Sequence, residues 1–247
     1  MTALVQLRGV SKTFGAAAAL HSTDIAFERA KTTVLIGPSG CGKSTLLRLI
    51  IGLLEPDDGI IQFEGAPTTF ANIADLRRRI GYVIQDGGLF PHLTARQNVL
   101  LMSMHLKRPA AEMDQRLTEL CALTRFPQTA LDRYPIELSG GQRQRISLMR
   151  ALALSPELLL LDEPLGALDP LVRAALQKDL KEIFARLKQT AILVTHDLAE
   201  AAYLGDVIVL MNEGRVVQIG TLEDLRTKPA AKFVTEFINA QRGLALV

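Results

Sequence analysis

The spacing of hydrophobic residues along this chain predicts an alternation of strands and helices. Apolar and polar residues alternate over 4–10 and 24–28, as they do in strands with one exposed face. Several central runs are almost continuously apolar, which favours a parallel sheet that helices cover on both faces. Further short runs that predict strands lie at 31–36, 59–65, 81–85, 158–161, 191–195, 207–211 and 216–220.

Helical spacing of apolar residues occurs between these runs. Residues 46–54 predict a buried helix, and the segment 55–59, rich in helix breakers, ends it. A second helix is predicted over 176–187, where the apolar residues share one face, and a third is predicted over 222–240.

The segment 86–155 has a different character. Strand signals stop there, and helical spacing of apolar residues extends over 94–106 and 110–124. Strand and helix then alternate again from 158 onward. The pattern therefore predicts an α/β core that is interrupted by a helical insert.

Composition narrows the possible classes of protein. The chain has 247 residues, with 28 Lys and Arg against 26 Asp and Glu, and the net charge of +2 is small for a protein that binds an extended phosphate backbone, so we expect no nucleic-acid partner. Hydrophobic residues make up 48%, yet no run reaches the roughly 20 apolar residues of a spanning helix. The N-terminus has no signal-peptide core, and Cys41 and Cys121 suit a reducing compartment. We therefore expect a cytoplasmic protein. Its many apolar residues either form the buried part of a large sheet or contact a membrane partner.

A glycine-rich loop follows the strand predicted at 31–36 and precedes the first helix. Its pattern is that of a phosphate-binding P-loop, in which glycines let backbone N–H groups turn toward a phosphate at the positive end of a helix. Lys43 can reach the β- and γ-phosphates, and Ser44 can bind Mg²⁺. The nucleotide-binding residues that we expect from this loop are Gly37, Pro38, Ser39, Gly40, Cys41, Gly42, Lys43, Ser44 and Thr45.

Two carboxylates follow the apolar run at 158–161. Ligands of open α/β sheets bind at the carboxyl ends of the strands, where Asp162 and Glu163 would lie. We expect Asp162 to hold Mg²⁺, directly or through water, and Glu163 to polarise the attacking water.

The sequence Leu-Ser-Gly-Gly-Gln at 138–142, followed by Arg143, Gln144 and Arg145, resembles the signature of the nucleotide-binding subunits of ABC transporters. The resemblance extends over essentially the whole chain. Other elements of the family follow in order: Gln85 matches the Q-loop, Asp169 the D-loop and His196 the switch histidine. Phe14 stands where the family has an adenine-stacking aromatic residue that is usually a tyrosine.

The resemblance implies a single ABC ATPase domain. Its fold would be α/β, with a P-loop NTPase core whose mostly parallel sheet is covered by helices, an antiparallel β subdomain and a helical-insert subdomain. Residues 1–85 and 156–247 would form the RecA-like core with the antiparallel β subdomain, and 86–155 the helical signature subdomain. In such a domain Gln85 joins Ser44 and Asp162 at Mg²⁺, and Gln85, Glu163 and His196 take part in hydrolysis.

The resemblance also implies a second ATP-binding subunit in an ATP sandwich dimer, and we expect this subunit to be identical in sequence. Ser139, Gly140, Gly141 and Gln142 would bind the γ-phosphate held by the other subunit, because a helix N-terminus attracts anions. Asp169 would communicate across that interface, and loss of the γ-phosphate would open the dimer.

Separate membrane subunits would complete such a transporter. We expect permease subunits to dock near 85–93, where Leu89 and Phe90 would be apolar anchors beside two glycines; packing of both side chains in the core is the alternative. The subunit would then lie in the cytoplasm, peripheral on the inner face of the membrane. A solute-binding protein would be an indirect partner.

The sequence around the Q-loop and the signature is similar to importers of quaternary-amine osmoprotectants such as glycine betaine, choline and carnitine. Asp86, Gly87 and Ile136 depart from that group, and we expect no regulatory module after 222–240. An exporter, another importer class for amino acids or lipids, and a soluble ABC ATPase stay open as alternatives. The signature argues against a small-molecule kinase.

Overall fold

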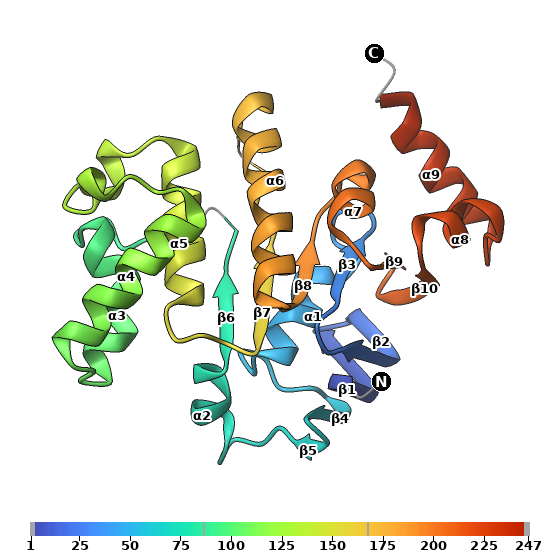
Figure 1. Cartoon of the computed structure of the whole chain (residues 1–247). Coiled ribbons are helices and arrows are strands. Elements are labelled where there is room, and N and C mark those ends of the chain that lie inside the picture. The colour runs from blue at the N-terminus through green and yellow to red at the C-terminus, as the bar shows by residue number, and fades with distance from the viewer. Residues whose placement is uncertain (1–2, 86, 167, 245–247) are drawn as a thin grey trace.

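The central sheet has six strands in the order β10–β9–β3–β8–β7–β6 (Figure 1). The computed structural model describes residues 3–85, 87–166 and 168–244. Neighbouring strands are parallel except for β10, which runs antiparallel to β9. The strands are β3 (Thr32–Ile36), β6 (Ile80–Val83), β7 (Leu158–Asp162), β8 (Thr190–Val194), β9 (Val207–Asn212) and β10 (Arg215–Gly220).

A second, antiparallel sheet has the order β2–β1–β4–β5. Its first hairpin is longer than the sequence predicts, because β2 starts at Ala17, opposite Phe14, whereas the alternating pattern is evident only from 24 onward. Residues 16–19 are all alanine, so apolar and polar side chains do not alternate there and no strand pattern is visible. The strands are β1 (Ala3–Phe14), β2 (Ala17–Glu28), β4 (Asp58–Phe63) and β5 (Ala66–Pro67).

Helices of the core cover the central sheet, and α6 stands in front of β7 in Figure 1. The single helix expected over 222–240 is wrong: α8 ends at Thr227 and α9 starts at Lys232. Pro229 lies between them, and a proline disfavours helical backbone at the residue before it. The core helices are α1 (Lys43–Ile50), α2 (Ile73–Arg78), α6 (Pro170–Leu187), α7 (Leu198–Leu204), α8 (Leu222–Thr227) and α9 (Lys232–Leu244).

Three helices form a separate group between β6 and β7, on the left in Figure 1: α3 (Ala95–His105), α4 (Ala110–Thr124) and α5 (Gly140–Leu152). Short 3-10 turns at Gln128–Ala130 and Pro135–Glu137 join α4 to α5. Both α3 and α5 begin with a capping box, in which Thr94 pairs with Gln97 and Ser139 with Gln142. The helical insert predicted from the missing strand signals is therefore present.

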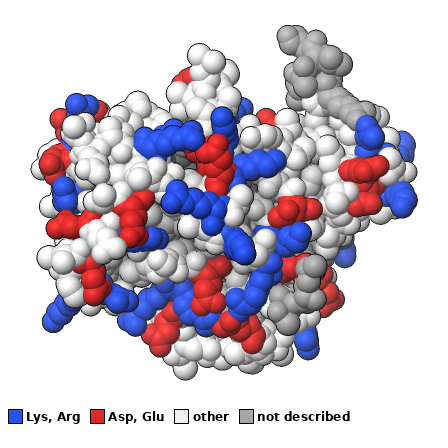
Figure 2. Space-filling view, viewed as in Figure 1, with Lys and Arg blue, Asp and Glu red and all other residues white. Residues whose placement is uncertain are grey.

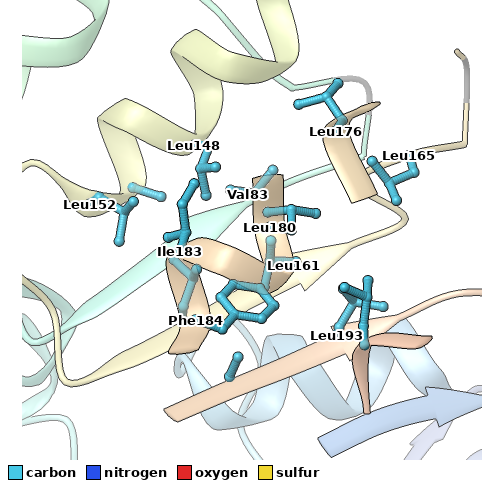
Figure 3. Packing of buried hydrophobic residues seen from close by; sticks show 14 of the residues in the cluster. Val83, Leu148, Leu152, Leu161, Leu165, Leu176, Leu180, Ile183, Phe184 and Leu193 are labelled. Atoms are coloured by element: carbon cyan, nitrogen blue, oxygen red, sulfur yellow. The ribbon is translucent and has the colours of Figure 1, made fainter. Parts of the chain in front are cut away.

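Two apolar cores lie on the two faces of the central sheet. Alternate residues of β7 point to opposite faces, so Leu159 and Leu161 belong to one core and Leu158 and Leu160 to the other. Figure 3 shows the first core, where α6 packs on Leu161 through residues such as Leu180. The apolar excess of the sequence is thus largely buried. Within 3–85, 87–166 and 168–244, no helix is long and apolar enough to span a membrane.

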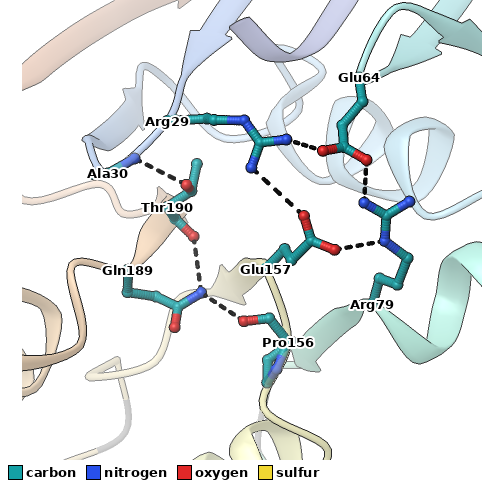
Figure 4. A network of polar contacts seen from close by, with 8 residues as sticks. All are labelled: Arg29, Ala30, Glu64, Arg79, Pro156, Glu157, Gln189 and Thr190. Atoms are coloured by element: carbon teal, nitrogen blue, oxygen red, sulfur yellow. Dashed lines mark hydrogen bonds and ion pairs between the residues drawn. The ribbon is translucent and has the colours of Figure 1, made fainter. Parts of the chain in front are cut away.

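Charged residues join the two sheets at the amino ends of the central strands. Arg29 and Glu64 follow β2 and β4, and Arg79 and Glu157 precede β6 and β7 (Figure 4). The two arginines and two glutamates alternate in a ring, in which Arg79 Nε lies 2.6 Å from Glu157 Oε1. The Arg79 guanidinium holds the pKa of Glu157 below its usual value. Elsewhere on the face seen in Figure 2, basic and acidic residues are interspersed.

Candidate functional site

The P-loop joins β3 to α1, as the sequence predicts. Lys43, the first residue of α1, is 6% exposed, and its ammonium group donates to the carbonyl oxygens of Gly37 at 2.8 Å and Pro38 at 2.9 Å. The lysine is thus held over the loop, where its charge can meet a phosphate. The loop comprises Gly37, Pro38, Ser39, Gly40, Cys41 and Gly42, and Ser44 and Thr45 continue into the helix.

Gly42 caps α1 in a left-handed conformation with φ of 99°. A Cβ atom at this position would lie 2.4 Å from the carbonyl oxygen of Ala19 in β2. Only glycine allows both the positive φ and this close approach. The β1–β2 hairpin therefore packs directly against the loop.

Asp162 ends β7 beside the P-loop. Its side chain is almost completely buried, and Asp162 Oδ1 accepts a 2.9 Å hydrogen bond from Ser44 Oγ. Burial raises the pKa of Asp162, and the nearby charge of Glu163 raises it further, while the bond from Ser44 lowers it. A hydroxyl and a carboxylate are hard oxygen ligands of the kind that Mg²⁺ prefers.

The described residues contain no group of three His, Cys, Asp or Glu side chains that could hold a metal ion. A Mg²⁺ ion next to Ser44 and Asp162 would need further oxygens from water and from nucleotide phosphates. That is the usual way in which proteins bind this ion. The donor set therefore fits Mg²⁺ bound together with a nucleotide.

Glu163 and His196 approach each other across the ends of β7 and β8. Glu163 Oε2 lies 3.6 Å from His196 Nδ1, and the side chains are 27% and 59% exposed. Glu163 has a positive φ of 47°, although its N–H still bonds to Val194 O. A non-glycine residue rarely adopts this conformation, and such backbone often marks a functional site.

A buried hydrogen bond supports the turn that carries His196. Thr195 Oγ1 donates to Glu200 Oε2 at 2.6 Å and accepts from the N–H of Asp197 at 3.1 Å. Burial raises the pKa of Glu200. No motif in the sequence indicates Thr195 or Glu200; the one signal for them is the short interval from His196 to an acidic residue.

Gln85 lies two residues beyond β6, because the strand ends at Val83 and not at Gln85 as the sequence predicts. Its side chain is exposed at a hollow of about 510 Å³. Glu163 and His196 line the same hollow, together with Gly140 and Arg143 at the start of α5. The structure thus brings Gln85, Glu163 and His196 together.

Ser139 and Asp169 both cap helices. Ser139 Oγ accepts from Gln142 N at 3.2 Å, and Asp169 Oδ1 accepts from Val172 N at 3.1 Å at the start of α6. A Cβ atom on Gly141 would lie 2.7 Å from Val172 Cγ1, so the two helix starts touch. Ser139, Gly140, Gly141 and Gln142 therefore surround a helix N-terminus, which is an anion-binding position.

Phe14 ends β1, and its ring is 49% exposed. The Lys12 ammonium lies 5.8 Å from the centre of the ring. Because the hairpin of β1 and β2 packs on the P-loop at Gly42, an exposed aromatic face is available on the element next to the loop.

The loop after Gln85 is held by the helical group. Arg150 Nη1 donates to Gly88 O at 2.8 Å and Nη2 to Gly87 O at 2.9 Å, while Ser147 Oγ donates to Gly87 O at 2.7 Å. Burial lowers the pKa of Arg150. Asp86 lies outside the described residues.

Leu89 and Phe90 differ in exposure. Leu89 is partly buried and packs against the apolar core, which agrees for this residue with the alternative that the sequence left open. Phe90 is 42% exposed and lines a groove of about 650 Å³. Asn98, which no motif in the sequence indicates, has a fully buried amide that bonds to both the N–H and the carbonyl of Phe90.

The chain is similar in sequence to several characterised transport proteins. The chain is 45% identical over 240 residues to the glycine betaine/carnitine/choline transport ATP-binding protein of Bacillus subtilis, covering 97% of this chain and 63% of that protein. It is 44% identical over 245 residues to a glycine betaine uptake system ATP-binding protein of Escherichia coli, covering 99% and 80%. It is also 44% identical to a sulfate/thiosulfate import ATP-binding protein of Bacillus cereus, covering 95% and 66%.

Solved structures share the fold. A protein from Clostridium perfringens that is part of an ABC transporter complex superimposes with a TM-score of 0.84 at 28% identity, over 100% of this chain and 96% of that one. A dimeric cassette in a post-hydrolysis state, bound to ADP and Pi, gives 0.80 at 30% identity, over 88% and 98%. The sequence model described as ABC transporter matches residues 20–166, and the chain therefore belongs to the ABC transporter family.

Proposed function

We propose that this chain is the ATP-binding and ATP-hydrolysing subunit of an ABC importer. The observation that carries the proposal is the joining of two sites: Ser44 of the P-loop bonds to Asp162, and Glu163 next to it faces His196. A phosphate-binding loop and a group that can activate water are thereby adjacent.

The P-loop residues bind the phosphates of ATP, and Lys43 turns its ammonium from the loop carbonyls to the β- and γ-phosphates. Ser44 and Asp162, with Gln85 at the edge of the hollow, would hold Mg²⁺. When bound, this ion neutralises charge on the phosphates. The Phe14 ring stacks on the adenine.

Glu163 accepts a hydrogen bond and then a proton from water, whose oxygen attacks the γ-phosphorus. The bond from that phosphorus to the bridging oxygen breaks, and ADP and phosphate are released. His196 donates a hydrogen bond to the γ-phosphate and fixes the attacking water together with Gln85. The turn that carries His196 is rigid because Thr195 bonds to both Glu200 and Asp197.

The signature residues act on the nucleotide of a second subunit, which we take to be a second copy of this chain. Ser139 and the N–H groups of Gly140 and Gly141 bind its γ-phosphate, and Asp169 contacts the opposite site. ATP then joins the two subunits, and by linkage closure strengthens ATP binding. Hydrolysis removes the bridging charge and opens the dimer. A dimeric cassette among the similar solved structures supports this arrangement.

Permease subunits dock in the groove beside Phe90. Its lining is apolar at Phe90, Tyr82 and Met102, and basic at Arg78 and Arg150. An amphipathic helix with acidic residues would match both features. Docking of this kind would place the chain on the cytoplasmic side of the membrane as a peripheral subunit.

The solute is proposed to be a quaternary amine, because relatives named for glycine betaine, choline and carnitine reach 44–45% identity. A solute-binding protein would deliver it. The chain spans 63% of the length of the Bacillus subtilis relative, so solute and partners come from the comparison and not from this chain's own site.

The test is reconstitution. The chain is purified with the permease that it captures and inserted into vesicles, and ATP turnover and uptake are measured with radiolabelled glycine betaine, choline, carnitine and sulfate. Stimulation by a quaternary amine is expected, and Lys43→Ala should abolish ATP binding and uptake. Stimulation by sulfate alone would assign the chain to the sulfate importers, which the 44% identical relative makes the second candidate.

A further inference from the structure

A buried carboxylate on α6 contacts two arginines of the helical group. Asp179 is 3% exposed, and its Oδ2 lies 2.7 Å from Arg145 Nη2 on α5. Its Oδ1 accepts from Arg125 at the end of α4. Arg125 also reaches the exposed Glu182 at 2.7 Å. Asp179 is therefore the shared point of contact for α4, α5 and α6.

Arg145 belongs to the helix that the signature begins. It is 17% exposed and forms an ion pair with Asp179, and its Nη1 donates to the carbonyl oxygen of Thr124, in the last turn of α4. Neither Arg145 nor Asp179 lines the hollow that holds Glu163 and His196. Their interaction therefore cannot act on a nucleotide directly.

The starts of the same two helices meet at a second point. Gly141 packs against Val172, and Leu168 Cδ2 would lie 3.3 Å from a Cβ on Gly140. These contacts occur beside Ser139, which caps α5, and close to Asp169, which caps α6. The helices are thus fixed near their N-termini by close packing and farther along by the ion pair.

The ion pair between Arg145 and Asp179 stabilises one orientation of α5 relative to α6. A buried carboxylate that loses its partners is strongly destabilised, because the remaining charge is neither solvated nor paired. If the helical group tilted away from α6, both arginines would leave Asp179. The cost of that separation holds the orientation of α5 relative to α6.

We propose that Asp179 is a positioning residue, which ties the signature helix to α6 so that Ser139 and Asp169 reach the second subunit as one rigid unit. The role rests on the proposed function, in which the signature binds the nucleotide of the other subunit. A residue that only stabilised the fold would instead affect the whole chain, including nucleotide binding by the single subunit.

The first test measures hydrogen exchange in the nucleotide-free chain. Asp179→Asn keeps the shape but removes the charge, and we expect amides at 144–150 in α5 to exchange about tenfold faster, with those of α1 unchanged. Glu182→Gln is the matched control, because Glu182 lies on the same helix, is exposed and, among the residues that the structure describes, pairs with Arg125 alone. Unchanged exchange in α5 of Asp179→Asn would overturn the proposal.

The second test measures ATP-dependent dimerisation in a Glu163→Gln background by analytical ultracentrifugation. Asp179→Asn should raise the protein concentration for half-maximal dimer about tenfold, while the ATP affinity of the monomer stays the same. Adding Arg145→Gln should restore part of the loss, because the arginine without its partner is then removed. Parental dimerisation, or an equal loss of monomer ATP affinity, would contradict the proposal.

The two tests separate this proposal from the proposed function. If Glu163→Gln alone forms no dimer with ATP, the sandwich mechanism fails. The exchange measurement still decides whether Asp179 holds α5 to α6.

Discussion

Ser44 Oγ donates a 2.9 Å hydrogen bond to Asp162 Oδ1, and this bond joins the P-loop to the end of the buried strand β7. Both groups are ligands suited to Mg²⁺, and burial raises the pKa of Asp162. Binding of the ion requires the ionised carboxylate, so protons and Mg²⁺ compete for the same group.

Affinity for the Mg²⁺–nucleotide complex should therefore depend on pH. The affinity should fall as the pH drops through the raised pKa of Asp162, and level off above it. Asp162→Asn should bind the complex at least about tenfold more weakly and lose this pH dependence. Titration calorimetry between acidic and neutral pH, with EDTA as the metal-free control, measures both. A parallel pH dependence in Asp162→Asn would assign it to another group.

The carboxyl group of Asp162 also affects the free energy of unfolding. A raised pKa means that the folded state binds the proton more tightly than the unfolded state. Asp162 thus lowers the free energy of unfolding as the pH rises from its ordinary pKa to the raised one. Urea unfolding without nucleotide should show this decrease in the parental chain, and a smaller one in Asp162→Asn.

Thr195→Val should slow hydrolysis without weakening ATP binding. The variant keeps the shape of the side chain but leaves the buried Glu200 without its hydroxyl donor and frees the N–H of Asp197. We expect kcat to fall about tenfold with KM for ATP nearly unchanged, because His196 loses its fixed position. Thr195→Ser retains the hydroxyl and is the control. Equal kcat values for the two variants would show that the bond does not position His196.

Phe14→Ala should weaken ATP binding about tenfold, since stacking of a base on an aromatic ring contributes on the order of 1–3 kcal/mol. Phe14→Tyr should keep the affinity. Phe70→Ala removes a phenylalanine that is 91% exposed in another part of the surface, and it should have no effect. Fluorescent-nucleotide titration compares the three variants. If Phe14→Ala binds as tightly as Phe70→Ala, the adenine lies elsewhere.

Ser139→Arg should leave ATP binding by the single subunit intact but block dimer closure. An arginine at the helix start occupies the space that the second subunit's phosphate requires. Turnover should fall about a hundredfold or more, as for loss of a transition-state donor. Mixing Ser139→Arg with Lys43→Ala subunits should restore one working site per dimer. Normal turnover by Ser139→Arg alone would refute action on the other subunit's nucleotide.

Much of the fold could be predicted because the central strands are continuous apolar runs. Leu158–Leu161 and the glycine pattern at 37–42 determine the strand, the loop and the position of Asp162 through local chemistry alone. The start of β2 at Ala17 could not be predicted, because pairing with β1 and not periodicity creates that part of the strand. Pro229 indicates the break between α8 and α9, but the apolar residues on both sides of it keep helical spacing and so predict one continuous helix.

Contacts between distant segments account for the rest of the site. The loop before Leu89 is held by bonds that Ser147 and Arg150 make to Gly87 and Gly88, 60 or more residues away in the chain. The pairing of Arg145 with Asp179 likewise depends on how α5 crosses α6. Neither contact leaves a local pattern in the sequence.

The ATP turnover and assembly state of Glu163→Gln test the proposed mechanism of ATP hydrolysis in a dimer most directly. We expect this variant to bind ATP with parental affinity, to lose at least about 99% of turnover and to form a stable dimer with ATP and Mg²⁺, as seen by analytical ultracentrifugation. Hydrolysis at the parental rate by a monomeric Glu163→Gln would contradict both the role of Glu163 and the ATP-dependent dimer.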